Sequence, residues 1–121
     1  MEWNIAADSP IYLQLARQIR LGIVSGGFGP GAKLPTVREL AMSAGVNPNT
    51  MQRALAELER DGLVYANRTA GRYVTDDAEL IARARAELAG EQTRTYLAAM
   101  RRLACDRDEI LGLVEDMSKE E

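Results

Sequence analysis

Amide, hydroxyl and guanidinium side chains lie close together in the stretch from Asn47 to Arg53. Amides can hydrogen-bond the edges of DNA bases, and a guanidinium can bind guanine or phosphate oxygens through two parallel hydrogen bonds. The side chains that could make such contacts are Asn47, Asn49, Thr50, Gln52 and Arg53. Helix capping is the alternative role at the start of this stretch, favoured for Asn47, and a solvated helix face is the alternative for Gln52 and Arg53.

Acid–base and metal chemistry have little support in this chain. It contains no histidine, no cluster with metal-ligand spacing, and a single cysteine, Cys105. We therefore predict that the protein is not an enzyme and needs no catalytic residue, metal or cofactor. Cys105 is interpreted as a small, at least half-buried residue, with a redox-sensing thiol as the alternative. The glycine-rich segment 26–31 lacks the flanking residues of a phosphate-binding loop.

Composition indicates a globular protein with an uneven charge distribution. The chain has 121 residues, 46% of them hydrophobic and 27% charged, and no apolar run long enough to span a membrane. Residues 1–75 carry 8 Lys and Arg against 6 Asp and Glu, whereas residues 76–121 carry 7 against 12. The net charge of +2 in the first part is compatible with DNA binding, which depends on where cations meet phosphates. No secretory signal is visible, so a cytoplasmic location is expected.

Two short helices joined by a tight turn are predicted to hold the polar stretch. Thr36 and Glu39 have the spacing of a capping box, which starts a helix that runs to about Ala44. Gly45 suits the end of that helix, and Asn47 with Pro48 suits the start of the next. This arrangement is a helix-turn-helix. A further helix is predicted before it, from about Pro10 to Val24, with Ser9 as the expected N-cap. The residues expected to form the core around the helix-turn-helix are Leu40, Val46, Met51, Leu55, Leu58 and Val64.

A β-hairpin is predicted after the second helix of this pair. The runs 63–65 and 73–75 are β-prone and are separated by a polar turn with Gly71. A hairpin in this place is a wing, and Arg68 and Arg72 flank its tip. Such a basic tip can enter the minor groove or hold phosphates. Residues 1–75 are thus expected to form a winged helix-turn-helix domain.

Residues 76–121 are predicted to be a helical dimerisation tail. Their apolar residues recur at helical spacing on both sides of a polar break at about residues 106–108. Two helices cannot enclose a core alone, so a second copy of the chain is the expected partner. The apolar residues assigned to dimerisation are Leu80, Ile81, Leu88, Tyr96, Leu97, Met100, Leu103, Ile110, Leu111 and Val114. The expected fold is mainly α with a small β-hairpin.

Several motifs in fixed order resemble the GntR family of bacterial transcription regulators. They are PIYLQL at 10–15, LPTVRELA at 34–41 and GVNPNT at 45–50, within a match over about residues 10–75. The Asn-Pro-Asn-Thr turn, the segment from Glu59 and the short helical C-terminal part resemble the YtrA subfamily. The chain departs from the family at Pro48, where many members have arginine, and at Thr69, where the wing usually has glycine.

This resemblance implies a sequence-specific regulator that contacts DNA through Arg38, for which a surface salt bridge is the alternative role. We expect a homodimer on a pseudo-palindromic double-stranded operator, acting as a repressor. The YtrA resemblance suggests control of a neighbouring operon, often one for an ABC transporter, and neither names a small-molecule effector nor excludes one. The alternatives are a protein-interaction module, which would not need arginines on the recognition face, and a ligand sensor with a groove between its C-terminal helices.

Overall fold

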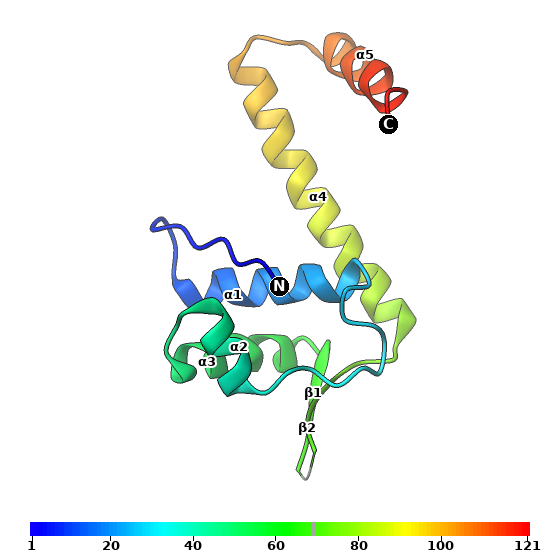
Figure 1. Ribbon diagram of the computed structural model, residues 1–121. Helices are drawn as coiled ribbons and strands as arrows, with labels where there is room; N and C mark the ends of the chain where they lie inside the picture. The colour runs from blue at the N-terminus through cyan, green and yellow to red at the C-terminus, as the bar shows by residue number, and fades with distance from the viewer. Residues whose placement is uncertain (69) are drawn as a thin grey trace. The chain divides into compact units, whose positions relative to one another are not determined.

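The computed structural model describes residues 1–68 and 70–121. Its elements, in chain order, are α1 (Ile11–Val24), α2 (Val37–Ala44), α3 (Pro48–Arg60), β1 (Val64–Asn67), β2 (Gly71–Val74), α4 (Ala78–Arg102) and α5 (Arg107–Ser118) (Figure 1). The predicted fold class is confirmed, since the chain is mainly helical with one antiparallel hairpin. It divides into two compact units, Met1–Arg85 and Ala86–Glu121, and the boundary falls within α4. None of the described helices is long and apolar enough to cross a membrane.

The helix-turn-helix of α2 and α3 forms where the capping residues predict it. The Thr36 hydroxyl accepts a hydrogen bond from the Glu39 backbone N–H at 3.1 Å, and a Glu39 carboxylate oxygen accepts one from the Thr36 N–H at 3.0 Å. Gly45 ends α2 with φ of 69°, a left-handed conformation that glycine adopts without a Cβ penalty. Asn47 then caps α3, and its side-chain oxygen accepts the Asn49 N–H at 2.8 Å. The capping box and the capping of α3 by Asn47 are confirmed.

Acidification is expected to weaken the capping box of α2. The Thr36 backbone N–H and then the Thr36 hydroxyl stabilise the Glu39 carboxylate and hold its pKa below the ordinary value. A carboxylate with a lowered pKa stabilises the folded state at pH values above its unfolded-state pKa. This stabilisation is lost as the pH falls through its folded-state pKa. The urea midpoints of the wild type and Glu39→Gln should therefore differ at neutral pH and converge in acid. Thr36→Ala, which removes the hydroxyl, should cost about 1 kcal/mol at neutral pH. A Glu39→Gln difference independent of pH would contradict the charge effect.

The start of α1 differs from the prediction. Ser9 was expected to cap the helix, but α1 begins at Ile11, Pro10 occupies the N-cap position and no side chain of the described residues caps the helix. The segment before α1 is instead held by the amide of Gln14, which donates to the carbonyls of Ala6 and Ser9 at 2.8 Å each and accepts the Ala6 N–H at 2.7 Å. This amide holds the segment before α1 in place from within the helix.

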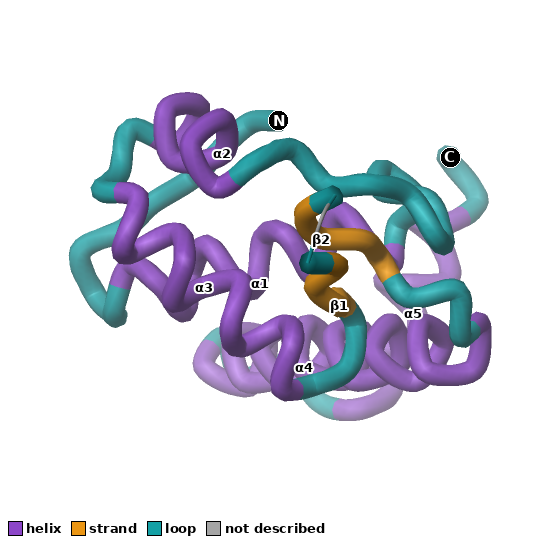
Figure 2. The backbone as a smooth tube through the Cα atoms, turned by 90° about the horizontal axis from the view of Figure 1, so that it is seen from below, coloured by secondary structure: helices purple, strands orange, loops and turns teal. Residues whose placement is uncertain are grey.

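The hairpin is antiparallel and joined by a third extended segment. β1 and β2 pair with Val64 opposite Val74 and Asn67 opposite Gly71. The Leu34 N–H donates to the Arg72 carbonyl and the Val74 N–H donates to the Ala32 carbonyl, both at 2.9 Å. The segment between α1 and α2 therefore lies along β2. The hairpin projects beyond the helices of the first unit (Figure 1), and Figure 2 shows it in a view along its length, so the predicted wing is present.

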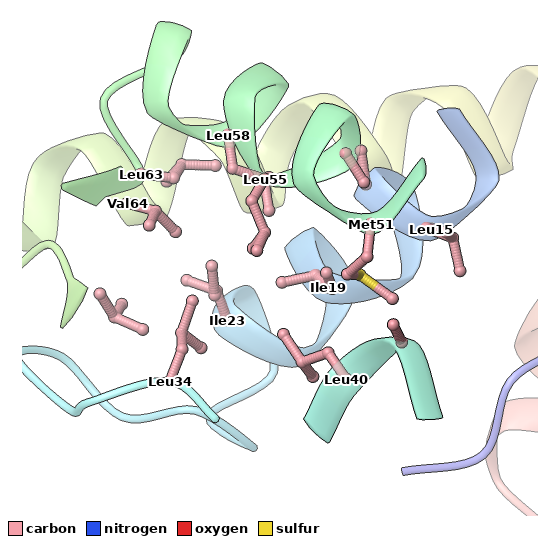
Figure 3. Packing of buried hydrophobic residues seen from close by; sticks show 14 of the residues in the cluster. Leu15, Ile19, Ile23, Leu34, Leu40, Met51, Leu55, Leu58, Leu63 and Val64 are labelled. Carbon is pink, nitrogen blue, oxygen red and sulfur yellow. The ribbon is translucent and has the colours of Figure 1, made fainter. Parts of the chain in front are cut away.

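One apolar core holds the first unit together. Buried side chains from α1, α2, α3 and the hairpin meet between the helices (Figure 3). The buried members are Leu15, Ala16, Ile19, Ile23, Leu34, Leu40, Ala41, Met51, Ala54, Leu55, Leu58, Leu63, Val64, Val74 and Ala84. Five of the six predicted core residues belong to this set, and Val46 packs against it partly buried. The core therefore fixes α3 from one side only.

The second unit contains the end of α4 and all of α5. Asp106 starts α5 with a second capping box, in which its side chain accepts the Glu109 N–H at 2.9 Å and its own N–H donates to Glu109 at 3.1 Å. The chain turns between the helices at Ala104, which has φ of 62°. The polar break predicted at residues 106–108 is thus the start of α5. Cys105 is half-buried, as the sequence predicts.

Candidate nucleic-acid interface

The N-terminal half of α3 carries a polar face opposite its buried one. Met51 and Leu55 are buried in the core, whereas Asn49, Gln52 and Arg53 are exposed. Thr50 is half-buried, and its backbone N–H donates to the Asn47 carbonyl at 3.0 Å. The structure therefore brings the predicted amide and guanidinium groups together on one accessible surface. Side chains at this end of a recognition helix can contact base edges.

Arg38 lies in the first turn of α2 and is exposed. Within residues 1–68 and 70–121, no side chain makes an ion pair with it, so the alternative role of a surface salt bridge is not observed. A guanidinium that is not neutralised within the chain keeps its N–H donors available for phosphate oxygens. Arg38 is thus free to bind an anion.

The two wing arginines have different surroundings. Arg68 is exposed beside Thr69, which lies outside the described residues. Arg72 is on β2, and its Nε donates to a Glu59 carboxylate oxygen on α3 at 2.5 Å. The side chain of Arg72 is only 20% exposed and that of Glu59 only 32% exposed. The sequence did not reveal this pair, which links the wing to α3 and engages the guanidinium that had been expected at the tip.

Contacts at the C-terminal end of α3 fix its position. The Asp61 carboxylate, which follows the helix, pairs with the Arg20 guanidinium of α1. Gly62 has φ of 79°, and a Cβ there would lie 3.3 Å from the Leu80 side chain. The Arg20–Asp61 and Glu59–Arg72 pairs hold the end of α3 that lies away from the polar face.

The family model of bacterial regulatory proteins of the gntR family matches residues 11–74, which include α1, the helix-turn-helix and the hairpin. The chain belongs to the GntR family. It is accordingly a DNA-binding transcriptional regulator with a winged helix-turn-helix, and the predicted family is confirmed.

Two curated relatives are HTH-type regulators from Bacillus subtilis. The uncharacterized transcriptional regulator YhcF is 37% identical over 92% of this chain and 92% of its own length. The transcriptional repressor YtrA is 41% identical over 60% of this chain, and that match spans 56% of YtrA. The similarity to YhcF therefore includes the C-terminal helices of this GntR-family chain, whereas the similarity to YtrA covers little more than half of each protein.

Solved structures support the same assignment. A GntR family transcriptional regulator from Listeria monocytogenes matches with a TM-score of 0.84 and 36% identity, over 93% of this chain and 98% of that one. The DNA-binding domain of AraR in complex with operator ORX1 matches with a TM-score of 0.54 and 27% identity. The AraR match covers 62% of this chain and 99% of that domain, which shows a related domain on an operator.

The residues assigned to dimerisation lie outside the segment that the GntR family model matches. Leu80 and Ile81 pack partly buried against the core of the first unit. In the second unit Ile110 is buried, whereas Tyr96, Leu103, Leu111 and Val114 are exposed. Leu88 is also buried, and Leu97 and Met100 are half-buried. Their role in dimerisation stays a prediction.

Proposed function

We propose that the chain is a homodimeric repressor whose α3 helices read a pseudo-palindromic operator in successive major grooves. The observation that carries this proposal is the exposed polar face formed by Asn49, Gln52 and Arg53 at the start of α3. Arg38 and Arg68 would add phosphate or minor-groove contacts. The AraR domain bound to operator ORX1 supports this use of the fold, and the name of the relative YtrA supports repression.

Exposed apolar side chains in the second unit support the homodimer. Unpaired apolar surface on a helix favours association, because burying it removes it from water. The large apolar residues of this unit that remain exposed are Tyr96, Leu103, Leu111, Leu113, Val114 and Met117. A second copy of the chain that covers them would place two recognition helices on one operator, with half-sites about 34 Å apart.

The target proposed for this regulator is a neighbouring operon, such as one for an ABC transporter. This part of the proposal rests on the resemblance of the sequence motifs to the YtrA subfamily. A regulator of DNA acts in the compartment that holds the chromosome, so we place it in the cytoplasm. An effector is not required by the proposal, since operator binding alone can block transcription.

Selection of bound duplexes from a random library tests the proposed operator recognition. The purified chain should enrich a sequence with two inverted half-sites, and the enriched duplex should also occur upstream of the regulated operon. Titration against unrelated competitor DNA across a salt series then separates specific from non-specific affinity. Failure to enrich any sequence would contradict operator recognition.

Two single variants should separate backbone binding from base reading. Arg38→Ala removes a phosphate contact, so it should weaken binding to all duplexes alike and reduce the salt slope by about 1. Asn49→Ala removes an amide from the recognition face, so it should cost about 1 to 3 kcal/mol on the selected operator and relax the base preference at one position.

The matched control for Arg38→Ala is Arg60→Ala. Arg60 is an exposed arginine in the last turn of α3, away from the polar face, and it pairs with Glu57. The operator affinity of Arg60→Ala should stay close to that of the wild type.

If Asn49→Ala left both affinity and base preference unchanged, the assignment of Asn49 to base reading would be wrong.

A further inference from the structure

One arginine of the recognition face is held by an aromatic ring. The Cζ atom of Arg53 on α3 lies 3.8 Å from the centroid of the Tyr12 ring on α1. At this distance the planar guanidinium is in contact with the face of the ring, where the ring quadrupole attracts a cation. Tyr12 is half-buried and packs against the core, whereas Arg53 is exposed. A fixed ring therefore supports a side chain at the surface.

The stacked pair lies beside the other candidate DNA contacts. Tyr12 and Arg53 line a shallow hollow together with Ile11, Asn49 and Thr50. The hollow combines the first turn of α1 with the first half of α3. The guanidinium of Arg53 therefore shares one surface hollow with Asn49 and Thr50.

A guanidinium that stacks on a ring keeps its net positive charge and its N–H donors, whereas an ion pair offsets the charge and occupies donors. Arg72 shares its Nε–H with Glu59, so a carboxylate already offsets its charge. Arg53 contacts an uncharged ring instead, and no ion pair is recorded for it in the described part of the chain. Its positive charge and its in-plane N–H donors stay available. The ring also limits the rotamers of a long side chain, which lowers the entropic cost of binding.

We propose that Tyr12 is a positioning residue for DNA recognition, whose ring orients Arg53 toward a bidentate acceptor on the operator. This proposal rests on the DNA-binding function proposed above and deepens it. Phosphate oxygens and the edge of guanine offer the same pair of acceptors to a guanidinium. Tyr12 acts through Arg53 and is not itself required to touch DNA.

A double-mutant cycle on the full-length protein tests the proposal. The variants are Tyr12→Leu, Arg53→Ala and the double variant, titrated with the selected operator and with an unrelated duplex. Tyr12→Leu should weaken binding roughly 2- to 10-fold, since it removes one partly exposed stacking contact. In the Arg53→Ala background the same substitution should have no further effect, because the side chain that the ring positions is absent.

Two more variants separate positioning from a general effect on folding. Tyr12→Phe keeps the ring and should retain wild-type affinity and melting temperature. Arg53→Lys keeps the charge but loses the planar, bidentate donors, so it should bind less well than the wild type. The salt slope and the base preference identify the acceptor: a lower slope indicates phosphate, and a relaxed preference at one guanine indicates a base edge.

Additive losses for Tyr12→Leu and Arg53→Ala would overturn the proposal, because independent effects mean that the ring does not act through the arginine. Equal losses for Tyr12→Phe and Tyr12→Leu would also overturn it. If the wild type bound all duplexes equally, the operator-specific function would fail. Coupling between Tyr12 and Arg53 on the unrelated duplex at low salt would still establish the positioning role, and its absence would exclude that role.

Discussion

Replacement of Leu111 by aspartate is expected to convert the proposed dimer into a monomer and to weaken binding to the full operator by about 100-fold or more. Leu111 is 54% exposed on α5, so the isolated chain gains little from its burial. In a dimer interface a new carboxylate would be buried without a partner, which is strongly unfavourable. The affinity of two linked half-site contacts exceeds that of a single contact by a factor on the order of 100 to 10,000, and a monomer would lose this advantage.

Molar mass by light scattering and titration with full and half operators measure the two consequences separately. The first unit has its own core, so binding to a half-site should be unchanged in Leu111→Asp. Ser118→Asp at the end of the same helix is the matched control, because it adds the same charge at an exposed polar position. A variant that remained dimeric with full affinity would show that Leu111 lies outside the interface.

Leu55→Ala, which exchanges a buried isobutyl group for a methyl group, should cause a large loss of folding stability in the first unit. Leu55 is 1% exposed and lies in the middle of the core, in the same cluster as Ile19 and Leu58 (Figure 3). Truncation of a buried leucine removes apolar contacts and leaves a cavity, at a cost of about 3 kcal/mol. Urea unfolding followed by circular dichroism measures this cost, and operator affinity should fall where the variant begins to unfold.

Leu21→Ala provides the control for this experiment on the neighbouring helix α1. Leu21 is 56% exposed, and substitutions at such surface positions usually change stability by about 0.5 kcal/mol or less. The two variants make the same chemical change in different surroundings. Equal shifts in the urea midpoint would mean that Leu55 does not have the central role in packing that the structure assigns to it.

Local signals in the sequence were sufficient to predict the helix-turn-helix. The capping box of Thr36 and Glu39 and the Asn47 cap each involve residues at most three positions apart, so residue type and spacing determine them. The core positions followed from the same logic, because a helical period places them on one face. The polar face of α3 could therefore be predicted as the opposite face of that helix.

Contacts between distant segments could not be predicted in this way. Trp3 donates its indole N–H to the Ser43 hydroxyl at 3.0 Å, although 40 residues separate them. The Arg72–Glu59 pair and the Tyr12–Arg53 stack also join different elements. Such contacts depend on how the elements pack and on side-chain rotamers, which leave no periodic trace in the sequence. For this reason the sequence placed Arg72 beside the wing tip without its Glu59 partner and placed Tyr12 on the apolar side of the first helix without its contact to Arg53.

The asymmetric attachment of α3 has a consequence for how such regulators diverge. Its C-terminal end is held by ion pairs with Arg20 and Arg72, and its apolar face is held by the core. The exposed positions 49 and 52 at the other end contribute nothing to that core. Substitutions there would alter the chemistry that the proposed recognition face offers to bases, at little cost in folding stability. After gene duplication, a copy of this scaffold could acquire a new target sequence in single mutational steps without passing through an unfolded intermediate.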